Sequence, residues 1–194
     1  MNHLYEQLTA LKLTGFRDAL KKQLAQPGTY QELGFEERLS LLTAEELTCR
    51  ENRKAERLIK HARFRLNAEL SKLDYRNNRG LDRALIRSLS QGNWLTLKQN
   101  ILLTGATGSG KTFLACALGH NACRQGYKVY YYRLKALMEQ CYQGHADGRY
   151  SKLLTRLNNS DLLLLDDWGL EPLSSEQRSD LLEIVDLMYQ RGSI

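Results

Sequence analysis

The chain has 194 residues, of which 42% are hydrophobic and 26% are charged. That length and composition exclude an intrinsically disordered chain and fit a folded protein with a buried core. The sequence has no apolar run near the roughly 18 residues of a membrane span and no signal-peptide pattern, so we expect a cytoplasmic protein without membrane contact. The formal net charge of +6 favours a polyanionic partner, but only weakly.

The first third of the chain, residues 1–67, is expected to be entirely helical. Its leucines recur at the three-to-four-residue spacing of amphipathic helices. Pro27 and Gly28 interrupt the pattern. A long helix is then expected over residues 36–67, which contain neither Gly nor Pro. The sequence therefore predicts a helical N-terminal region.

Residues 68–99 are expected to be a connector, with turn residues at 74–80 and a short helix at 81–89. From residue 100 onward, short apolar runs alternate with helical stretches, which is typical of a parallel sheet with crossover helices. The expected strands are residues 100–104, 128–132 and 161–165. We therefore predict an α/β fold with helices on both faces of a parallel sheet, in a third region that covers residues 100–194. The tyrosines at 130–132 fit a core strand better than a base-stacking surface.

A glycine-rich segment fits the pattern GxxxxGK[ST] at every fixed position, between an apolar run and an expected helix. Its glycines allow successive backbone N–H groups to point at phosphate oxygens, and the helix adds the positive end of its dipole. Lys111 would reach the outer phosphates, and the hydroxyl of Thr112 would bind magnesium. The predicted nucleotide site consists of Gly105, Ala106, Thr107, Gly108, Ser109, Gly110, Lys111 and Thr112.

Two aspartates follow the leucine run of residues 162–165. Four consecutive leucines suit a strand that is buried on both faces, and open parallel sheets bind ligands at the carboxyl ends of their strands. We expect Asp166 to hold magnesium, directly or through water. Asp167 would orient or deprotonate the attacking water, which makes it and Lys111 the predicted catalytic residues.

Three segments together resemble a known family: "GATGSGKTFLACALG", "DLLLLDDWGLEPL" and "DYRNNRGLDRALIRSLSQGNW". They are similar to IstB, the ATP-binding helper of a class of bacterial insertion sequences, and the similarity covers nearly the whole chain. IstB is in turn similar to the helicase loader DnaC and belongs to the AAA+ ATPases. The resemblance implies an ATP-dependent, DNA-bound homo-oligomer that assists the transposase of the same insertion sequence.

The resemblance also marks two departures from the family. Most AAA+ relatives carry glutamate at the second acidic position, where this chain has Asp167. The family continues with a sensor strand, which inserts between the phosphate-loop strand and the acidic strand, and then with an arginine finger and a lid. This sequence ends at Ser193 and Ile194. The resemblance therefore implies a C-terminally truncated form, with weak or absent ATP hydrolysis by this chain alone.

Two groups of basic residues are candidate DNA contacts. On a helix, the first group shares a face roughly 120° wide, opposite an apolar face. This group is Arg50, Arg53, Lys54, Arg57 and Lys60. The second group shares one face of a shorter helix, near a point where the resemblance implies a helical element facing DNA. This group is Arg149, Lys152 and Arg156. For the first group, a solvated helix surface is the alternative.

Other functions share the same core motifs. A DnaC-like helicase loader in DNA replication would act on a replicative helicase instead of a transposase. A non-hydrolysing DNA-binding remnant is a further alternative. A small-molecule or nucleotide kinase is less consistent with the sequence, because we find no arginine-rich lid and because paired aspartates favour water as the nucleophile.

Overall fold

The chain forms two units in the computed structural model, which describes residues 2–75 and 81–194. The N-terminal unit covers residues 1–55 and the C-terminal unit covers residues 56–194. The expected turn at 74–80 lies mostly outside the described residues. The three-part division expected from the sequence stays a prediction.

Helices joined by short turns build the described part of the N-terminal unit, as the sequence predicts. They are α1 (Asn2–Ala10), α2 (Thr14–Ala25), α3 (Pro27–Tyr30) and most of α4 (Phe35–Ala62). Pro27 does end the first run of helices, but it also starts α3, because proline fits the first position of a helix.

A buried carboxylate fastens α2 to α4. Glu46 on α4 is 6% exposed and accepts a hydrogen bond of 3.0 Å from the backbone N–H of Phe16, in the first turn of α2. A negative charge at that end of a helix is favourable. Gly15 permits the close approach, since a Cβ atom there would lie 2.6 Å from the Cβ of Cys49. Arg50 completes the contact with a 2.7 Å ion pair to Glu46.

Helix α4 ends at Ala62, earlier than the sequence pattern predicts. Arg63 has a φ of +55 degrees, in the left-handed region that ends a right-handed helix. The next residues leave the helix, and Phe64 packs against the core of the C-terminal unit. The expected helix over 36–67 was therefore wrong at its C-terminal end.

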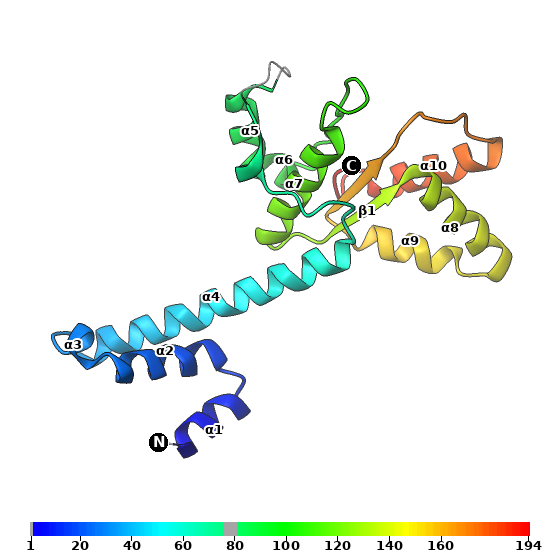
Figure 1. Ribbon diagram of the computed structural model, residues 1–194. Coiled ribbons are helices and arrows are strands. Elements are labelled where there is room, and N and C mark those ends of the chain that lie inside the picture. The colour runs from blue at the N-terminus through cyan, green and yellow to red at the C-terminus, as the bar shows by residue number, and fades with distance from the viewer. Residues whose placement is uncertain (1, 76–80) are drawn as a thin grey trace. The chain divides into compact units, whose positions relative to one another are not determined.

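A parallel pair of strands is the centre of the C-terminal unit (Figure 1). Strand β1 (Val129–Arg133) pairs with β2 (Leu162–Asp166), and Arg133 lies opposite Asp166 in the register. Helices α8 (Leu134–Asp147) and α9 (Tyr150–Asn158) form the crossover between them. The predicted α/β class with a parallel sheet is confirmed.

Helices cover both faces of the sheet. Leu163 of β2 is fully buried in a cluster with α8, α9 and α10 (Ser175–Met188). Leu162 faces the opposite cluster, which includes α7 (Lys111–Arg124) and the end of α4. Figure 1 shows α7 on one side of the strands and α8 to α10 on the other. Because side chains alternate along a strand, neighbouring residues of β2 serve different layers.

The remaining described elements cover the α7 side. They are the short 3-10 helix η1 (Leu70–Lys72), α5 (Arg83–Ser90) and α6 (Asn93–Thr96). The predicted short helix near 81–89 corresponds to α5. None of the described helices combines the length and the apolar character that crossing a bilayer requires.

The strand expected at residues 100–104 is not formed. Within the described part of the chain, the backbone of this segment makes one hydrogen bond to a residue distant in sequence, from the N–H of Ile101 to the carbonyl of Ile194 at 3.0 Å. Ser193 makes a parallel bridge with Leu162 on β2. Residues 193–194 thus lie between this segment and β2. A strand requires a ladder of such bonds, and a single bond does not make one.

Candidate functional site

The glycine-rich segment forms an exposed loop that leads directly into α7. Gly108 and Gly110 have φ values of +79 and +96 degrees, which residues with side chains rarely adopt. Gly110 is the residue before α7, and in the described chain no side chain caps this helix start. The first N–H groups of α7 are therefore available to an anion, as its dipole favours.

The Lys111 side chain folds back over the glycine-rich loop. Its Nζ donates to the backbone carbonyl oxygens of Gly105 and Ala106, both at 2.8 Å. The ammonium group is thus already placed over the loop that is predicted to receive phosphates. These two carbonyl oxygens are neutral acceptors, and phosphate oxygens would be stronger ones.

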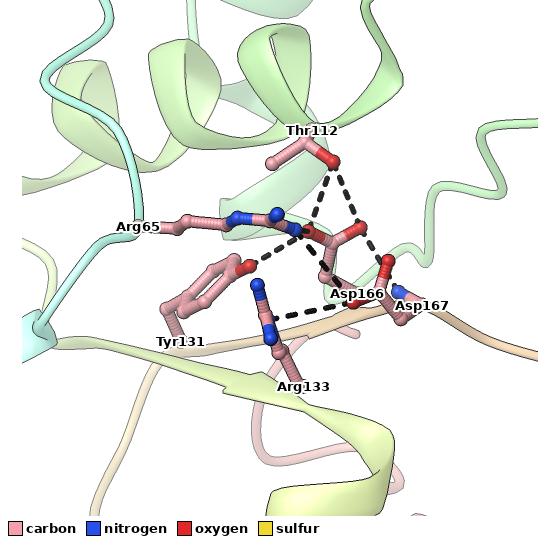
Figure 2. Close-up of polar contacts among 6 residues, drawn as sticks. All are labelled: Arg65, Thr112, Tyr131, Arg133, Asp166 and Asp167. Atoms are coloured by element: carbon pink, nitrogen blue, oxygen red, sulfur yellow. Dashed lines mark hydrogen bonds and ion pairs between the residues drawn. The ribbon is translucent and has the colours of Figure 1, made fainter. Parts of the chain in front are cut away.

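The two predicted magnesium ligands meet in the structure (Figure 2). The Oγ1 of Thr112 donates to the carboxylate of Asp166, at 3.1 Å from Oδ1 and 2.9 Å from Oδ2. Thr112 is in the first turn of α7, and Asp166 is the last residue of β2. Leu162 and Leu164 face the α7 layer, and side-chain alternation places Asp166 on that same face.

Tyr131 on β1 is a third member of this group that the sequence reasoning missed. Its phenol donates to Asp166 Oδ2 at 2.6 Å. The expected core role holds for all three tyrosines, since Tyr130 and Tyr132 pack against the α8–α10 side and Tyr131 packs against the α7 side. Tyr131 points to the opposite face, as alternation requires. A parallel pairing of the two strands could have revealed it.

The contacts of Asp166 set its charge state. Burial raises the pKa of Asp166, but hydrogen bonds from Tyr131 and Thr112, the N–H of Asp167 and the charge of Arg65 together lower it below its usual 3.8. The carboxylate is therefore ionised at neutral pH and can serve as a cation ligand. Burial and the bond to Asp166 raise the pKa of Tyr131, so its phenol remains a donor.

Asp167 lies beside Asp166 but turns to different partners. Its φ of +57 degrees is left-handed, and its N–H donates to Asp166 Oδ1 at 3.0 Å. Its carboxylate lies 3.7 Å from Arg65 and 3.4 Å from Arg133 (Figure 2). Neither arginine was predicted. The register Arg133↔Asp166 could have indicated the second, whereas Arg65 follows α4 and has no local signal.

The residues present fit a nucleotide and its metal. The loop offers uncapped N–H groups and a lysine for phosphates, and Thr112 and Asp166 offer the hydroxyl and carboxylate oxygens that magnesium prefers. The assignment of individual loop residues as ATP ligands, and of Asp167 as the base, stays a prediction.

We predict that ionised Asp166 stabilises the C-terminal unit. Because the folded pKa lies below the unfolded value of 3.8, this stabilisation is complete above the unfolded pKa and is lost as the pH falls through the folded pKa. The free energy of unfolding should fall as the pH drops from about 5 to about 3, and less steeply in Asp166→Asn. Urea titrations followed by tryptophan fluorescence at each pH measure this. Equal slopes in both proteins would contradict it.

The first predicted DNA group lies along α4. All five of its members are exposed. Arg50, however, is the ion-pair partner of the buried Glu46, so its charge already has a structural role. In the described chain, the other four have no ion pair. We call those four the α4 basic stripe: Arg53, Lys54, Arg57 and Lys60.

The second predicted DNA group is at the start and on the body of α9. Arg149 precedes α9 and is bound to Asp147. Arg156 donates to the phenol oxygen of Tyr132 at 2.6 Å and to Gln140 at 3.0 Å. Lys152 is exposed and unpaired among the described residues. The two arginines would have to leave these partners to contact DNA, and the DNA role of the group stays a prediction.

Comparison with known proteins gives consistent similarities. Residues 6–194 match the family model described as IstB-like ATP binding protein. A Pseudomonas fluorescens protein, named as a putative ATP-binding protein of insertion sequence IS1162, is 46% identical over 185 residues, covering 95% of this chain and 80% of that protein. A putative insertion-sequence ATP-binding protein of Sinorhizobium fredii is 41% identical, covering 97% of this chain and 76% of its own. The putative ATP-binding protein of insertion sequence IS21 from Pseudomonas aeruginosa is 28% identical, and the match covers 100% of this chain and 73% of that protein.

Proposed function

Because this chain belongs to the family of IstB-like ATP-binding proteins, we propose that it binds ATP with magnesium and acts on DNA as the helper of a transposase. The proposal joins two sites, one for the nucleotide and one for DNA. The first rests on geometry at the α7–β2 junction, and the second on exposed charge along α4.

The contact between Thr112 and Asp166 carries the nucleotide part. Residues 54 positions apart in the sequence are joined by hydrogen bonds of 3.1 and 2.9 Å, at the start of the helix that follows the glycine-rich loop. A chance glycine-rich turn would have no reason to place a hydroxyl against a largely buried acid. Magnesium held there would neutralise phosphate charge.

The protein's own groups divide the work of binding. The N–H groups of the loop and of the first turn of α7 would hold the inner phosphates. Lys111 would exchange its bonds to the Gly105 and Ala106 carbonyls for bonds to the outer phosphates. Asp167, once separated from its two arginines, would be free to orient a water molecule.

Calorimetric titration of the whole chain with ATP and magnesium tests the nucleotide part. Saturable heat on a sample shown to be folded by circular dichroism is the expected result. A folded sample that gives no heat up to millimolar ATP would contradict the proposal.

The α4 basic stripe carries the DNA part. Its side chains are exposed and its members repeat at helical spacing over about two turns, which suits contact with a run of phosphates. The same stripe could be a solvated surface, so the measurement must separate phosphate contact from general charge.

We predict that replacing Arg53, Arg57 and Lys60 with glutamine weakens duplex DNA binding and lowers its salt dependence. Each phosphate that the stripe no longer neutralises should reduce the slope of log K against log salt by about 0.9. Fluorescence anisotropy with a labelled duplex, at several salt concentrations, gives both quantities. The matched control replaces three exposed basic residues elsewhere: Lys22, Lys72 and Arg87. An equal weakening in both triple variants would indicate a net-charge effect and contradict a specific stripe.

The relatives named above are insertion-sequence proteins, and this supports a transposase as the partner over a replicative helicase. Assembly of several copies on DNA is part of the same proposal. Co-purification of the chain with an insertion-sequence transposase, in the presence of ATP and DNA, would test the choice of partner.

A further inference from the structure

We infer that Arg65 is a positioning residue of the nucleotide site, which holds the Asp166 and Asp167 carboxylates and competes with the divalent cation for Asp166. This inference rests on the proposed function and adds to it a residue that lies outside both the glycine-rich loop and the acidic strand. It concerns how the site is kept ready before magnesium and ATP bind.

The guanidinium of Arg65 is placed between the two acids. Its Nη1 lies 4.0 Å from Asp166 Oδ2 and 3.7 Å from Asp167 Oδ2. In the part of the chain that the structure describes, Arg133 is within ion-pair distance of Asp167 but not of Asp166. Among the described residues, Arg65 is therefore the one cationic side chain that reaches both carboxylates (Figure 2). Two adjacent carboxylates repel each other, and a cation that lies between them offsets this repulsion.

The backbone that carries Arg65 is fixed by its neighbours. Phe64 packs on α7, where its ring centroid lies 4.3 Å from that of His120. Gly119 leaves the room for this ring, because a Cβ atom there would lie 2.5 Å from Phe64 Cε1. Ala62 and Ala68, on either side, are 1% and 0% exposed. The position of Arg65 is thus set by core packing.

The side chain itself remains free to move away. The Arg65 side chain is 43% exposed, whereas that of Asp166 is 14% exposed. Solvent can therefore receive the guanidinium without any change in the buried residues around it. A fixed backbone with a mobile, charged end is what an exchangeable counter-ion requires.

Competition follows from the shared oxygen. Asp166 Oδ2 accepts from Tyr131 at 2.6 Å and from Thr112 at 2.9 Å, and it also faces Arg65. A carboxylate oxygen that binds magnesium cannot keep a second cation close without strong repulsion. Removing the guanidinium should therefore lower the magnesium concentration that the site needs.

The test compares Arg65→Gln with Arg63→Gln, which removes the same charge from the same segment at a residue with no ion pair to either aspartate among the described contacts. A fluorescent ATP analogue is held at fixed concentration, and magnesium is titrated into metal-stripped protein while anisotropy reports binding. Arg65→Gln should lower the magnesium midpoint about 5-fold, and Arg63→Gln should match the wild type. Arg65→Lys should fall between, since a point charge replaces the two-sided guanidinium.

Thermal unfolding gives a second readout that needs no nucleotide. Without divalent cations, Arg65→Gln should have a lower melting temperature than Arg63→Gln, because among the described residues only the ion pair of Arg133 with Asp167 is then left at the two acids. Added magnesium should reduce this difference in melting temperature. If Arg65→Gln proves unstable, the magnesium midpoint of Arg65→Lys, compared with that of the wild type, still tests the inference.

Three outcomes would overturn the inference. An unchanged magnesium midpoint in folded Arg65→Gln would show that Arg65 does not compete. Failure of that variant to bind the analogue at saturating magnesium would show that Arg65 contacts the nucleotide instead. Absence of binding by the wild type at any magnesium concentration would contradict the proposed function and this inference with it, whereas the first two outcomes contradict this inference alone.

Discussion

Replacing Lys111 with alanine is expected to weaken ATP binding by roughly 30- to 150-fold, which corresponds to about 2 to 3 kcal/mol. Among the described residues, the ammonium group of Lys111 is the one charged donor that lies over the loop. It donates hydrogen bonds to the carbonyls of Gly105 and Ala106. Alanine removes that charge and keeps the helix start, because alanine has the highest helix propensity. The loop and α7 should therefore persist, and the weakening should come from the phosphates.

Isothermal calorimetry with ATP and magnesium measures this effect, and the melting temperature of the unliganded variant shows whether the fold is kept. Lys72→Ala is the matched control, because Lys72 is an exposed lysine of the same unit whose 3.8 Å ion pair with Glu69 is worth little. It should bind ATP like the wild type. If Lys111→Ala binds ATP within about 3-fold of the wild type, the glycine-rich loop is not the phosphate site.

Local sequence signals allow the glycine-rich loop and the strand that ends at Asp166 to be predicted. Glycines at these spacings indicate backbone conformations that other residues rarely adopt, and Gly108 and Gly110 do have positive φ values. Four leucines in a row require two apolar layers, and the structure assigns Leu162 and Leu163 to opposite faces. Each of these features is decided by residues that are close in sequence.

The contacts that adjust the site depend on pairing across the chain, so they could not be predicted in the same way. Tyr131 reaches Asp166 only because β1 and β2 pair in one particular register. Arg65 arrives through the packing of Phe64 against α7, and it is far in sequence from either aspartate. Outside the site, Arg50 pairs with Glu46 one helical turn away, a contact that the sequence spacing allows, and only the contact of Glu46 with α2 depends on distant residues.

The strand expected at 100–104 shows the same dependence on distant partners. Its apolar composition is typical of a buried strand, and Leu103 does pack against a cluster of buried residues from α5 and α7. Backbone pairing, however, is limited to the bond between Ile101 and Ile194 in the described chain. Composition indicates which residues prefer a sheet, but the ladder forms only where a neighbouring strand supplies the hydrogen bonds.

Replacing Leu163 with alanine is expected to destabilise the C-terminal unit by about 3 to 4 kcal/mol. Leu163 is fully buried and belongs to the cluster that joins β2 to α8, α9 and α10. The change removes apolar packing against this helical layer, and the close packing of a core limits how far the helices can collapse into the space. Such a decrease is a large part of the roughly 5 to 15 kcal/mol that is usual for a domain.

Urea unfolding followed by tryptophan fluorescence measures this destabilisation in the correct unit, because both tryptophans of the chain, Trp94 and Trp168, belong to residues 56–194. Trp94 is 7% exposed and should dominate the signal, since Trp168 is already 54% exposed in the folded state. The control is Leu182→Ala on α10, where the leucine is 62% exposed and the cost should stay below about 0.5 kcal/mol. Equal costs at the two positions would mean that β2 is not the centre of this core, and the placement of Asp166 against Thr112 would then have no structural basis.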